Sequence, residues 1–166
     1  MTYVTDNPEP GQFGLVRIAG ITGKLISIGQ RFIGSGSRYT HAFVYVGSGM
    51  VVQGEPGGAK LTTLTRALNG REVVYSKIFL AEPERTEVIQ AALNLVGTPY
   101  SFLDYLAIGA SRLLHIKALE RYVGSTGHMI CSQLVDECYS RAGIHLFPYR
   151  IPGDITPGDL AHLIGA

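Results

Sequence analysis

A short glycine-rich turn between two strand-like segments constrains the fold of this chain more than any other feature. Residues 39–46 read Tyr-Thr-His-Ala-Phe-Val-Tyr-Val, and a second β-type segment at 50–54 follows directly after Gly47, Ser48 and Gly49. β-branched and aromatic residues on both sides of such a turn are typical of a β-hairpin. The two segments therefore predict a pair of adjacent antiparallel strands.

Further strands and helices are predicted on either side of this hairpin. We expect strands at 14–19 and 73–79, and helices at 21–33, 82–96, 101–114 and 131–141. Pro83 and the acidic residues around it favour a helix start, because proline suits the first turn and acids favour the positive end of the helix dipole. The predicted fold class is α+β, with an antiparallel sheet of about five strands packed against helices.

Length and composition indicate a single domain over residues 1–166. Of these 166 residues, 46% are apolar, which is enough to build a core without support from disulfides or metals. The net charge is +1 and 16% of the residues are charged, so the composition offers no broad basic surface. We therefore expect no nucleic-acid partner.

No segment has the character of a membrane span or a secretory signal. The longest apolar region, 88–114, is interrupted by polar residues that include Asp104 and Arg112, whereas a span needs about 20 mostly apolar residues. Residues 1–14 lack the apolar stretch of a signal peptide. We expect a cytoplasmic protein with no integral membrane segment, and the alternatives are a phage-encoded protein or export by another route.

The chain has two cysteines, Cys131 and Cys138, seven residues apart on one predicted helix. Such a spacing separates the two Cα atoms by about 10 Å, which exceeds the limit of roughly 7 Å for a disulfide. Both residues are therefore predicted to be free thiols in a reducing setting.

Cys131 is the candidate nucleophile. It opens a helix after the glycine-containing stretch 123–128, and the N–H groups at a helix start favour a negative charge on sulfur. This position predicts a thiol pKa below the reference value of about 8.5. The alternative is that Cys131 is a small buried apolar residue, the usual role of free cysteine. Cys138 lies in the middle of the helix and is expected to belong to the core.

Five histidines compete for the role of base: His41, His115, His128, His145 and His162. His41 stands out because it lies among apolar residues in a predicted strand, where a titratable side chain needs a partner. The alternative role for His41 is a core histidine bonded to a backbone carbonyl. His128, three residues before the candidate nucleophile, is the second choice, and the other three are expected at the surface.

A third group is expected to orient the imidazole of His41. If residues 47–49 form a three-residue loop, Glu55 lies directly opposite His41, and Gln53 lies diagonally on the same face. A two-residue loop would move Gln53 to the other face. Gln53 can fix the tautomer of the ring, whereas Glu55 can also stabilise the imidazolium by its charge. Both candidates remain open on the spacing alone.

The run His41-Ala-Phe-Val-Tyr-Val-Gly-Ser-Gly-Met-Val-Val-Gln53, followed ninety residues after the histidine by Cys131, resembles a known family. It is similar to the circularly permuted NlpC-like superfamily of papain-fold cysteine hydrolases, which includes lecithin retinol acyltransferase relatives and many bacterial and phage hydrolases. The opening strand 14–18 and the segment 97–100 extend the resemblance over most of the chain. It implies a papain-like fold and a catalytic triad of Cys131, His41 and Gln53.

The resemblance also implies a substrate and the residues that contact it. The expected reaction is cleavage of an amide or peptide bond, such as one in a cell-wall peptide, and Tyr100, Tyr39 and Ser132 are expected to bind the substrate. The acyltransferase branch carries Asn-Cys-Glu-His where this chain has Ile-Cys131-Ser-Gln. A lipid or thioester acyltransferase or acylhydrolase is therefore the first alternative, and an inactive acyl- or peptide-binding module is the second.

Metal and cofactor chemistry have no counterpart in the sequence. No His-x-x-x-His or Cys-x-x-Cys spacing is present, and residues 34–37 lack the lysine of a phosphate-binding loop. We expect neither a metal nor a cofactor.

Overall fold

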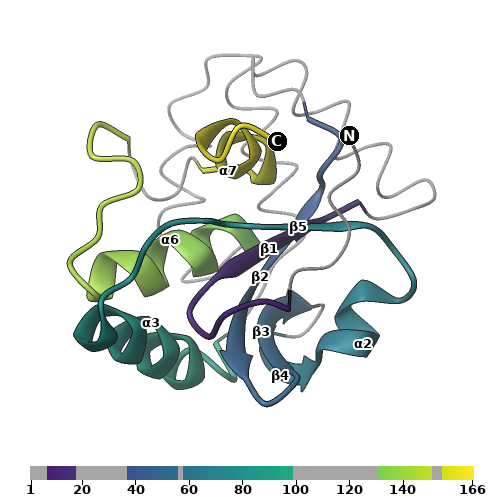
Figure 1. Cartoon of the computed structure of the whole chain (residues 1–166), viewed down its shortest axis with the longest axis horizontal. Helices are drawn as coiled ribbons and strands as arrows, with labels where there is room; N and C mark the ends of the chain where they lie inside the picture. The colour runs from purple at the N-terminus through teal and green to yellow at the C-terminus, as the bar shows by residue number, and fades with distance from the viewer. Residues whose placement is uncertain (1–6, 18–36, 56–57, 99–130, 151–154) are drawn as a thin grey trace.

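The computed structural model describes residues 7–17, 37–55, 58–98, 131–150 and 155–166. Within these ranges, five strands form one antiparallel sheet in the order β4-β3-β2-β1-β5 (Figure 1). The strands are β1 (Phe13–Val16), β2 (His41–Gly47), β3 (Met50–Glu55), β4 (Gly58–Thr63) and β5 (Val73–Tyr75). The predicted α+β class and the sheet of about five antiparallel strands are confirmed.

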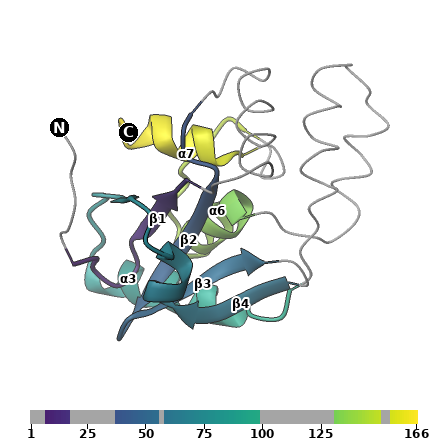
Figure 2. The same ribbon diagram turned by 90° about the vertical axis from the view of Figure 1, so that its right-hand side faces the viewer.

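Four helices belong to the described part of the chain: α2 (Leu64–Leu68), α3 (Glu82–Asn94), α6 (Cys131–Arg141) and α7 (Pro157–Leu163). The two longest, α3 and α6, begin at the residues that the sequence predicts for them. They lie side by side, and α7 lies toward the end of the sheet opposite the β2–β3 turn (Figures 1 and 2). His41 is the first residue of β2, and Cys131 is the first residue of α6. The predicted base and the predicted nucleophile therefore each lie at the start of an element.

β4, α2 and α7 have no counterpart among the predicted elements. Both helices are short and begin with a polar cap instead of a long apolar period. The Thr63 side chain accepts a hydrogen bond from the backbone N–H of Arg66 at 3.3 Å. At α7, Thr156 and Asp159 cap each other's backbone N–H groups, and Pro157 occupies the first turn. These capping residues are the sequence feature from which α2 and α7 could have been predicted.

The first and last strands of the sheet differ in extent from the prediction. β1 begins one residue earlier and ends at Val16, and β5 ends at Tyr75 instead of residue 79. After β5 the chain leaves the ladder, although the Ser76 N–H still donates to the Phe13 carbonyl at 2.9 Å. The helices predicted at 21–33 and 101–114 lie outside the described residues.

The turn between β2 and β3 contains two residues instead of the three of the favoured prediction. Gly47 pairs with Met50, so Ser48 and Gly49 form the loop. The φ angles are +51° at Ser48 and +71° at Gly49, the left-handed conformation that two-residue hairpin loops of this kind require. A two-residue loop on a regular ladder would have placed Gln53 on the wrong face of the sheet.

A β-bulge between Tyr45 and Gly47 restores the register that positions the site. Beyond the bulge, Phe43 lies opposite Gln53, which is the pairing that a three-residue loop predicts. A bulge adds one residue to one strand and thereby returns the side chains to their original faces. Gln53 therefore lies on the same face as the side chain of His41, as predicted, although the loop itself is shorter.

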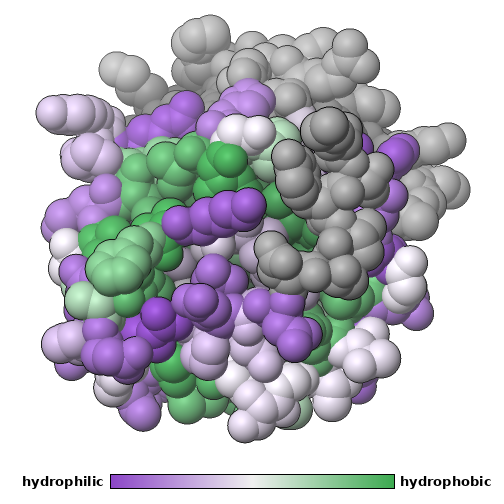
Figure 3. Space-filling view, viewed as in Figure 1, coloured by the Kyte–Doolittle hydropathy of each residue, from purple (hydrophilic) through white to green (hydrophobic). Residues whose placement is uncertain are grey.

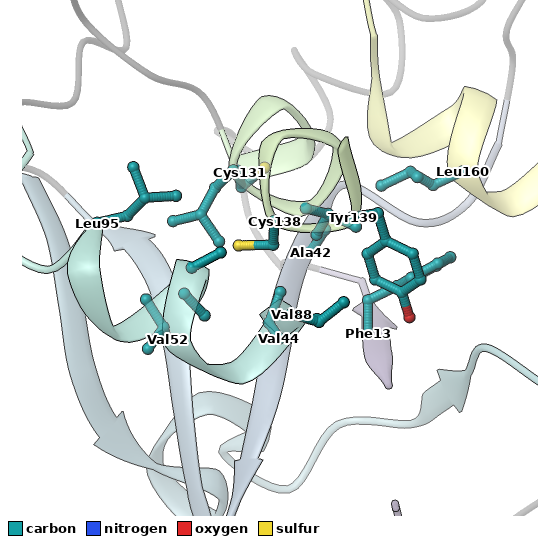
Figure 4. Packing of buried hydrophobic residues seen from close by; sticks show 14 of the residues in the cluster. Phe13, Ala42, Val44, Val52, Val88, Leu95, Cys131, Cys138, Tyr139 and Leu160 are labelled. Atoms are coloured by element: carbon teal, nitrogen blue, oxygen red, sulfur yellow. The ribbon is translucent and has the colours of Figure 1, made fainter. Parts of the chain in front are cut away.

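The sheet is buried on both faces, and the two faces have different partners. Ala42, Val44 and Val52 belong to the main core together with α3 and α6 (Figure 4). Phe43 and Val51 alternate with them and pack on the opposite face against Ala67 of α2. This alternation determines from which side of β2 each side chain near the site projects.

Some large apolar side chains remain at the surface. Phe79 is 87% exposed on the segment between β5 and α3. Figure 3 shows further hydrophobic residues, in green, on the face where Figure 1 shows α6 and α7.

Within the described ranges, none of the helices has the length and apolar character that crossing a membrane requires.

Candidate active site

Cys131 is the first residue of α6, and its side chain faces the sheet. It is 2% exposed, and Leu134, Val135 and Cys138 are buried on the same side of the helix (Figure 4). This spacing forms one inward stripe of an amphipathic helix, as the sequence predicts. Both thiols are free, as expected. The sulfur of Cys131 therefore meets the core of the protein at the start of a helix.

The thiol of Cys131 does not have the low pKa that its position at a helix start predicts. Burial raises its pKa to about 11, because the thiolate loses its hydration. The backbone N–H groups of Ala42, Ser132 and Cys131 itself act in the opposite direction and only partly offset this effect. The expectation of a thiolate at neutral pH was wrong, since desolvation outweighs the helix N-terminus here.

The imidazole of His41 is bonded to Gln53. Its Nε2 atom lies 2.8 Å from Oε1 of Gln53, and Nε2 of Gln53 donates to Oε1 of Glu55 at 2.9 Å. The two candidates for the orienting group therefore both take part, one behind the other. Gln53 is 5% exposed, so this amide has little water with which to exchange its partners.

These contacts decide where the proton on the His41 ring lies. The Glu55 carboxylate accepts, so the Gln53 NH₂ group must face it, and the Gln53 carbonyl must face the ring. A carbonyl also only accepts, so the neutral ring carries its proton on Nε2. The other nitrogen, Nδ1, is then left with its lone pair, as a general base needs.

The His41 ring is neutral in the resting protein. Burial lowers its pKa from 6.5, the hydrogen bond to Gln53 raises it, the charge of Arg71 lowers it, and that of Glu55 raises it. Burial is the largest of these causes. The resting pair is therefore an uncharged thiol and an uncharged imidazole, instead of the thiolate and imidazolium of many cysteine enzymes.

The Cys131 sulfur lies beside the peptide group of β2 that follows His41. The N–H of Ala42, the residue that follows His41, interacts with the Cys131 sulfur. Alternation places Ala42 on the α6 side of the strand, and His41 on the other side with Phe43 and Gln53. Within the described residues no hydrogen bond joins the sulfur to the ring.

This peptide lies where the β2–β3 ladder ends. The last pair is Phe43 with Gln53, although β2 begins two residues earlier, at His41, and β3 continues to Glu55. The ladder therefore does not hold the first residues of β2 against β3, and the Ala42 N–H is available to the sulfur.

Two of the residues expected to bind substrate have partners inside the protein. Ser132 is fully buried and donates its hydroxyl to the carbonyl of Ile155 at 2.5 Å. Tyr39 is buried in the main core, and its hydroxyl accepts from Nη2 of Arg38 at 2.9 Å. The Ser132 hydroxyl thus joins α6 to the segment before α7. Tyr100 lies outside the described residues.

The competing residues have the places expected for them, where the structure describes them. Cys138 is buried in the core, and burial raises its pKa to about 12. His145 and His162 are exposed. His128 and His115 lie outside the described residues. Cys138 is therefore a control thiol of similar burial without a strand N–H beside it.

Two cations near the site had not been identified from the sequence. Nζ of Lys60 lies 3.4 Å from Oε2 of Glu55, and Nη2 of Arg66 lies 3.9 Å from the same atom. Lys60 is paired with Gln53 across β3 and β4, so only recognition of β4 could have revealed it. In the part of the chain that the structure describes, no three His, Cys, Asp or Glu residues could together hold a metal ion.

A scan of the sequence against protein-family models finds no match, and a search of curated proteins finds none either. The observations that bear on function are therefore the contacts of His41, Gln53, Glu55 and Cys131.

Proposed function

We propose that this chain is a cysteine hydrolase of the papain-like, permuted NlpC-like kind, which cleaves an amide or peptide bond through a thioester at Cys131. The observation that carries the proposal is the hydrogen-bonded chain from Glu55 through Gln53 to Nε2 of His41. It leaves Nδ1 of His41 unprotonated. The next residue, Ala42, has a backbone N–H that interacts with the Cys131 sulfur. A nucleophile, a base and an orienting group are the parts that such catalysis requires.

The neutral resting pair supports attack with general-base assistance. As the Cys131 sulfur bonds to the acyl carbon, its proton passes to Nδ1 of His41, and the carbonyl electrons move to oxygen. The Cys131 backbone N–H at the start of α6 is suited to hold this oxyanion. The imidazolium then protonates the leaving amine as the C–N bond breaks. Water resolves the thioester with the same base, which returns the proton to the thiol.

The ring must turn toward the sulfur for the first proton transfer. The Cys131 sulfur and the His41 ring lie on the two sides of β2, and catalytic hydrogen bonds often tighten only when substrate binds. His41 begins β2, beyond the last β2–β3 pair at Phe43. Turning the ring toward the sulfur lengthens the contact between Nε2 and Gln53, so Gln53 sets the tautomer in the resting protein, before the ring turns.

A second candidate function is an acyl- or peptide-binding module without catalysis. It is favoured by the buried thiol with a pKa of about 11 and by the lack of a sulfur–ring hydrogen bond within the described residues. On this alternative, the hydrogen-bonded His41 ring stabilises the end of the sheet, and Cys131 serves only as a core residue.

A small activated ester separates these candidates. We expect p-nitrophenyl acetate to acylate wild-type protein at Cys131 with a burst of p-nitrophenolate, followed by turnover as water resolves the thioester, and peptide mapping of acid-quenched protein to locate the acetyl group. Cys131→Ala abolishes the adduct, His41→Ala slows its formation, and Cys138→Ala retains it. Equal labelling of Cys138, or no labelling, would leave only the binding module. Added glycinamide reports acyl transfer, with the Cys131→Ala protein as the blank for uncatalysed reaction: Cys131-dependent acetylation of most of the acyl groups onto this amine favours the acyltransferase alternative over hydrolysis.

A further inference from the structure

We propose that Glu55 is a positioning residue of this site, which acts through the Gln53 amide to keep the proton of His41 on Nε2. Its consequence for catalysis rests on the proposed function, whereas the position of the proton is a property of the resting protein. Sequence spacing presents Glu55 and Gln53 as alternatives for one role. The structure joins them in series, since Gln53 contacts both His41 and Glu55.

The Gln53 amide by itself does not determine the tautomer of His41, because it can either accept or donate a hydrogen bond. Rotated by half a turn, the Gln53 side chain would present its NH₂ group to the ring, and the ring would have to accept on Nε2. The ring proton would then lie on Nδ1, and Nδ1 could no longer accept a proton from the Cys131 sulfur. A fixed acceptor behind the amide removes this second arrangement. Oε1 of Glu55, 2.9 Å from Nε2 of Gln53, is such an acceptor.

The two oxygens of Glu55 have separate partners. Oε1 accepts from Gln53, and Oε2 faces Lys60 at 3.4 Å and Arg66 at 3.9 Å. The Glu55 side chain is 20% exposed, and the cations are far more exposed, so each ion pair by itself contributes little to stability. Together they attract Oε2 toward β4 and α2, which leaves Oε1 directed at the amide. Lys60 and Arg66 thus hold the acceptor in place.

The tautomer itself can be measured without any substrate. Protein labelled with ¹⁵N at the histidine rings shows in long-range ¹H–¹⁵N spectra which nitrogen carries the proton, and the exposed His145 and His162 serve as internal references. We expect the Nε2–H form in wild type, and in Glu55→Met a mixture that includes the Nδ1–H form. Glu55→Gln is expected to give a spectrum between these two, because its carbonyl can accept from Gln53 but its NH₂ group, in the rotated arrangement, cannot. Glu137→Met, at an exposed ion pair with Arg141, controls for loss of one carboxylate.

The acylation rate with p-nitrophenyl acetate at neutral pH gives the catalytic readout. Glu55→Met is expected to lower it by roughly ten- to a hundredfold, as loss of an outer orienting partner commonly does, while Glu55→Gln is expected to lie between Glu55→Met and wild type. Glu55→Ala replaces the methionine variant if the latter does not fold. An unchanged His41 tautomer in the folded variant overturns the role of Glu55. If the tautomer changes but wild-type acylation does not depend on His41, the positioning role stands and the proposed hydrolase fails.

Discussion

Nε2 of His41 lies 2.8 Å from Oε1 of Gln53, whose pairing with Phe43 is the last of the β2–β3 ladder. This contact determines which nitrogen of the ring could act as a base. Nε2 is hydrogen-bonded to Gln53 of the sheet, so Nδ1 is the nitrogen whose lone pair remains available. It also satisfies a buried imidazole N–H that would otherwise lack a partner.

Replacing the amide should weaken the fold as well as the site. We expect Gln53→Met to lower the free energy of unfolding by about 1–3 kcal/mol, because the imidazole N–H loses its acceptor in a buried position. Urea denaturation followed by circular dichroism measures this loss. Gln90→Met, at an exposed position of α3, is the matched control and should change stability by less than about 0.5 kcal/mol. Equal stability of both variants would contradict the importance of the contact.

The stability contributed by the neutral His41 should be lost in acid. Its pKa is lowered in the folded protein, so below pH 6.5 the unfolded chain binds a proton that the folded chain resists. The free energy of unfolding therefore falls as the pH drops from about 6.5. In His41→Gln this part of the pH dependence should disappear, whereas His162→Gln should keep it. Parallel pH profiles for wild type and His41→Gln would rule the prediction out.

The Cys131 thiol should behave as a buried thiol toward a simple alkylating agent. With a pKa of about 11, the thiolate fraction of Cys131 should rise about tenfold per pH unit between pH 7 and 9.5. Iodoacetamide alkylation of the Cys138→Ala variant should follow this slope. Acylation by the activated ester should rise less steeply, since neutral His41 assists it. An alkylation plateau below pH 8 would instead show a preformed thiolate.

Removal of the Ser132 hydroxyl should affect stability and spare the chemistry. Ser132→Ala leaves the buried carbonyl of Ile155 without its donor, which is expected to cost about 1–3 kcal/mol. The acylation rate at Cys131 should remain near wild type. Ser140→Ala, a half-buried position on the same helix, provides the comparison. A large loss of acylation in a stably folded Ser132→Ala protein would instead support the substrate-binding role expected for Ser132.

The register of the hairpin shows how a prediction can be right at the site and wrong at the loop. The glycine-rich turn indicated the hairpin, and a three-residue loop placed Gln53 on the face of His41. The structure reaches the same face with a two-residue loop and a bulge near Tyr45. The count of residues between two strands cannot distinguish these solutions, because a bulge adds the residue that the shorter loop lacks.

The thiol of Cys131 illustrates the opposite case. A helix start is visible in the sequence and favours a thiolate, and α6 does begin at this residue. The pKa is nevertheless raised, because residues from β2 and the core remove water from the sulfur. Desolvation depends on every group packed around an atom, and no local pattern reports it.

The sequence by itself determined the hairpin, the starts of α3 and α6, and the candidate residues His41, Gln53, Glu55 and Cys131. These features follow from turn residues, caps and apolar periods that act over a few positions of the chain. Only the tertiary structure decided that Glu55 stands behind Gln53, that Nδ1 of His41 is the free nitrogen, and that the thiol is uncharged. Those properties depend on hydrogen-bond geometry and on loss of water, which exist only after distant segments have packed together.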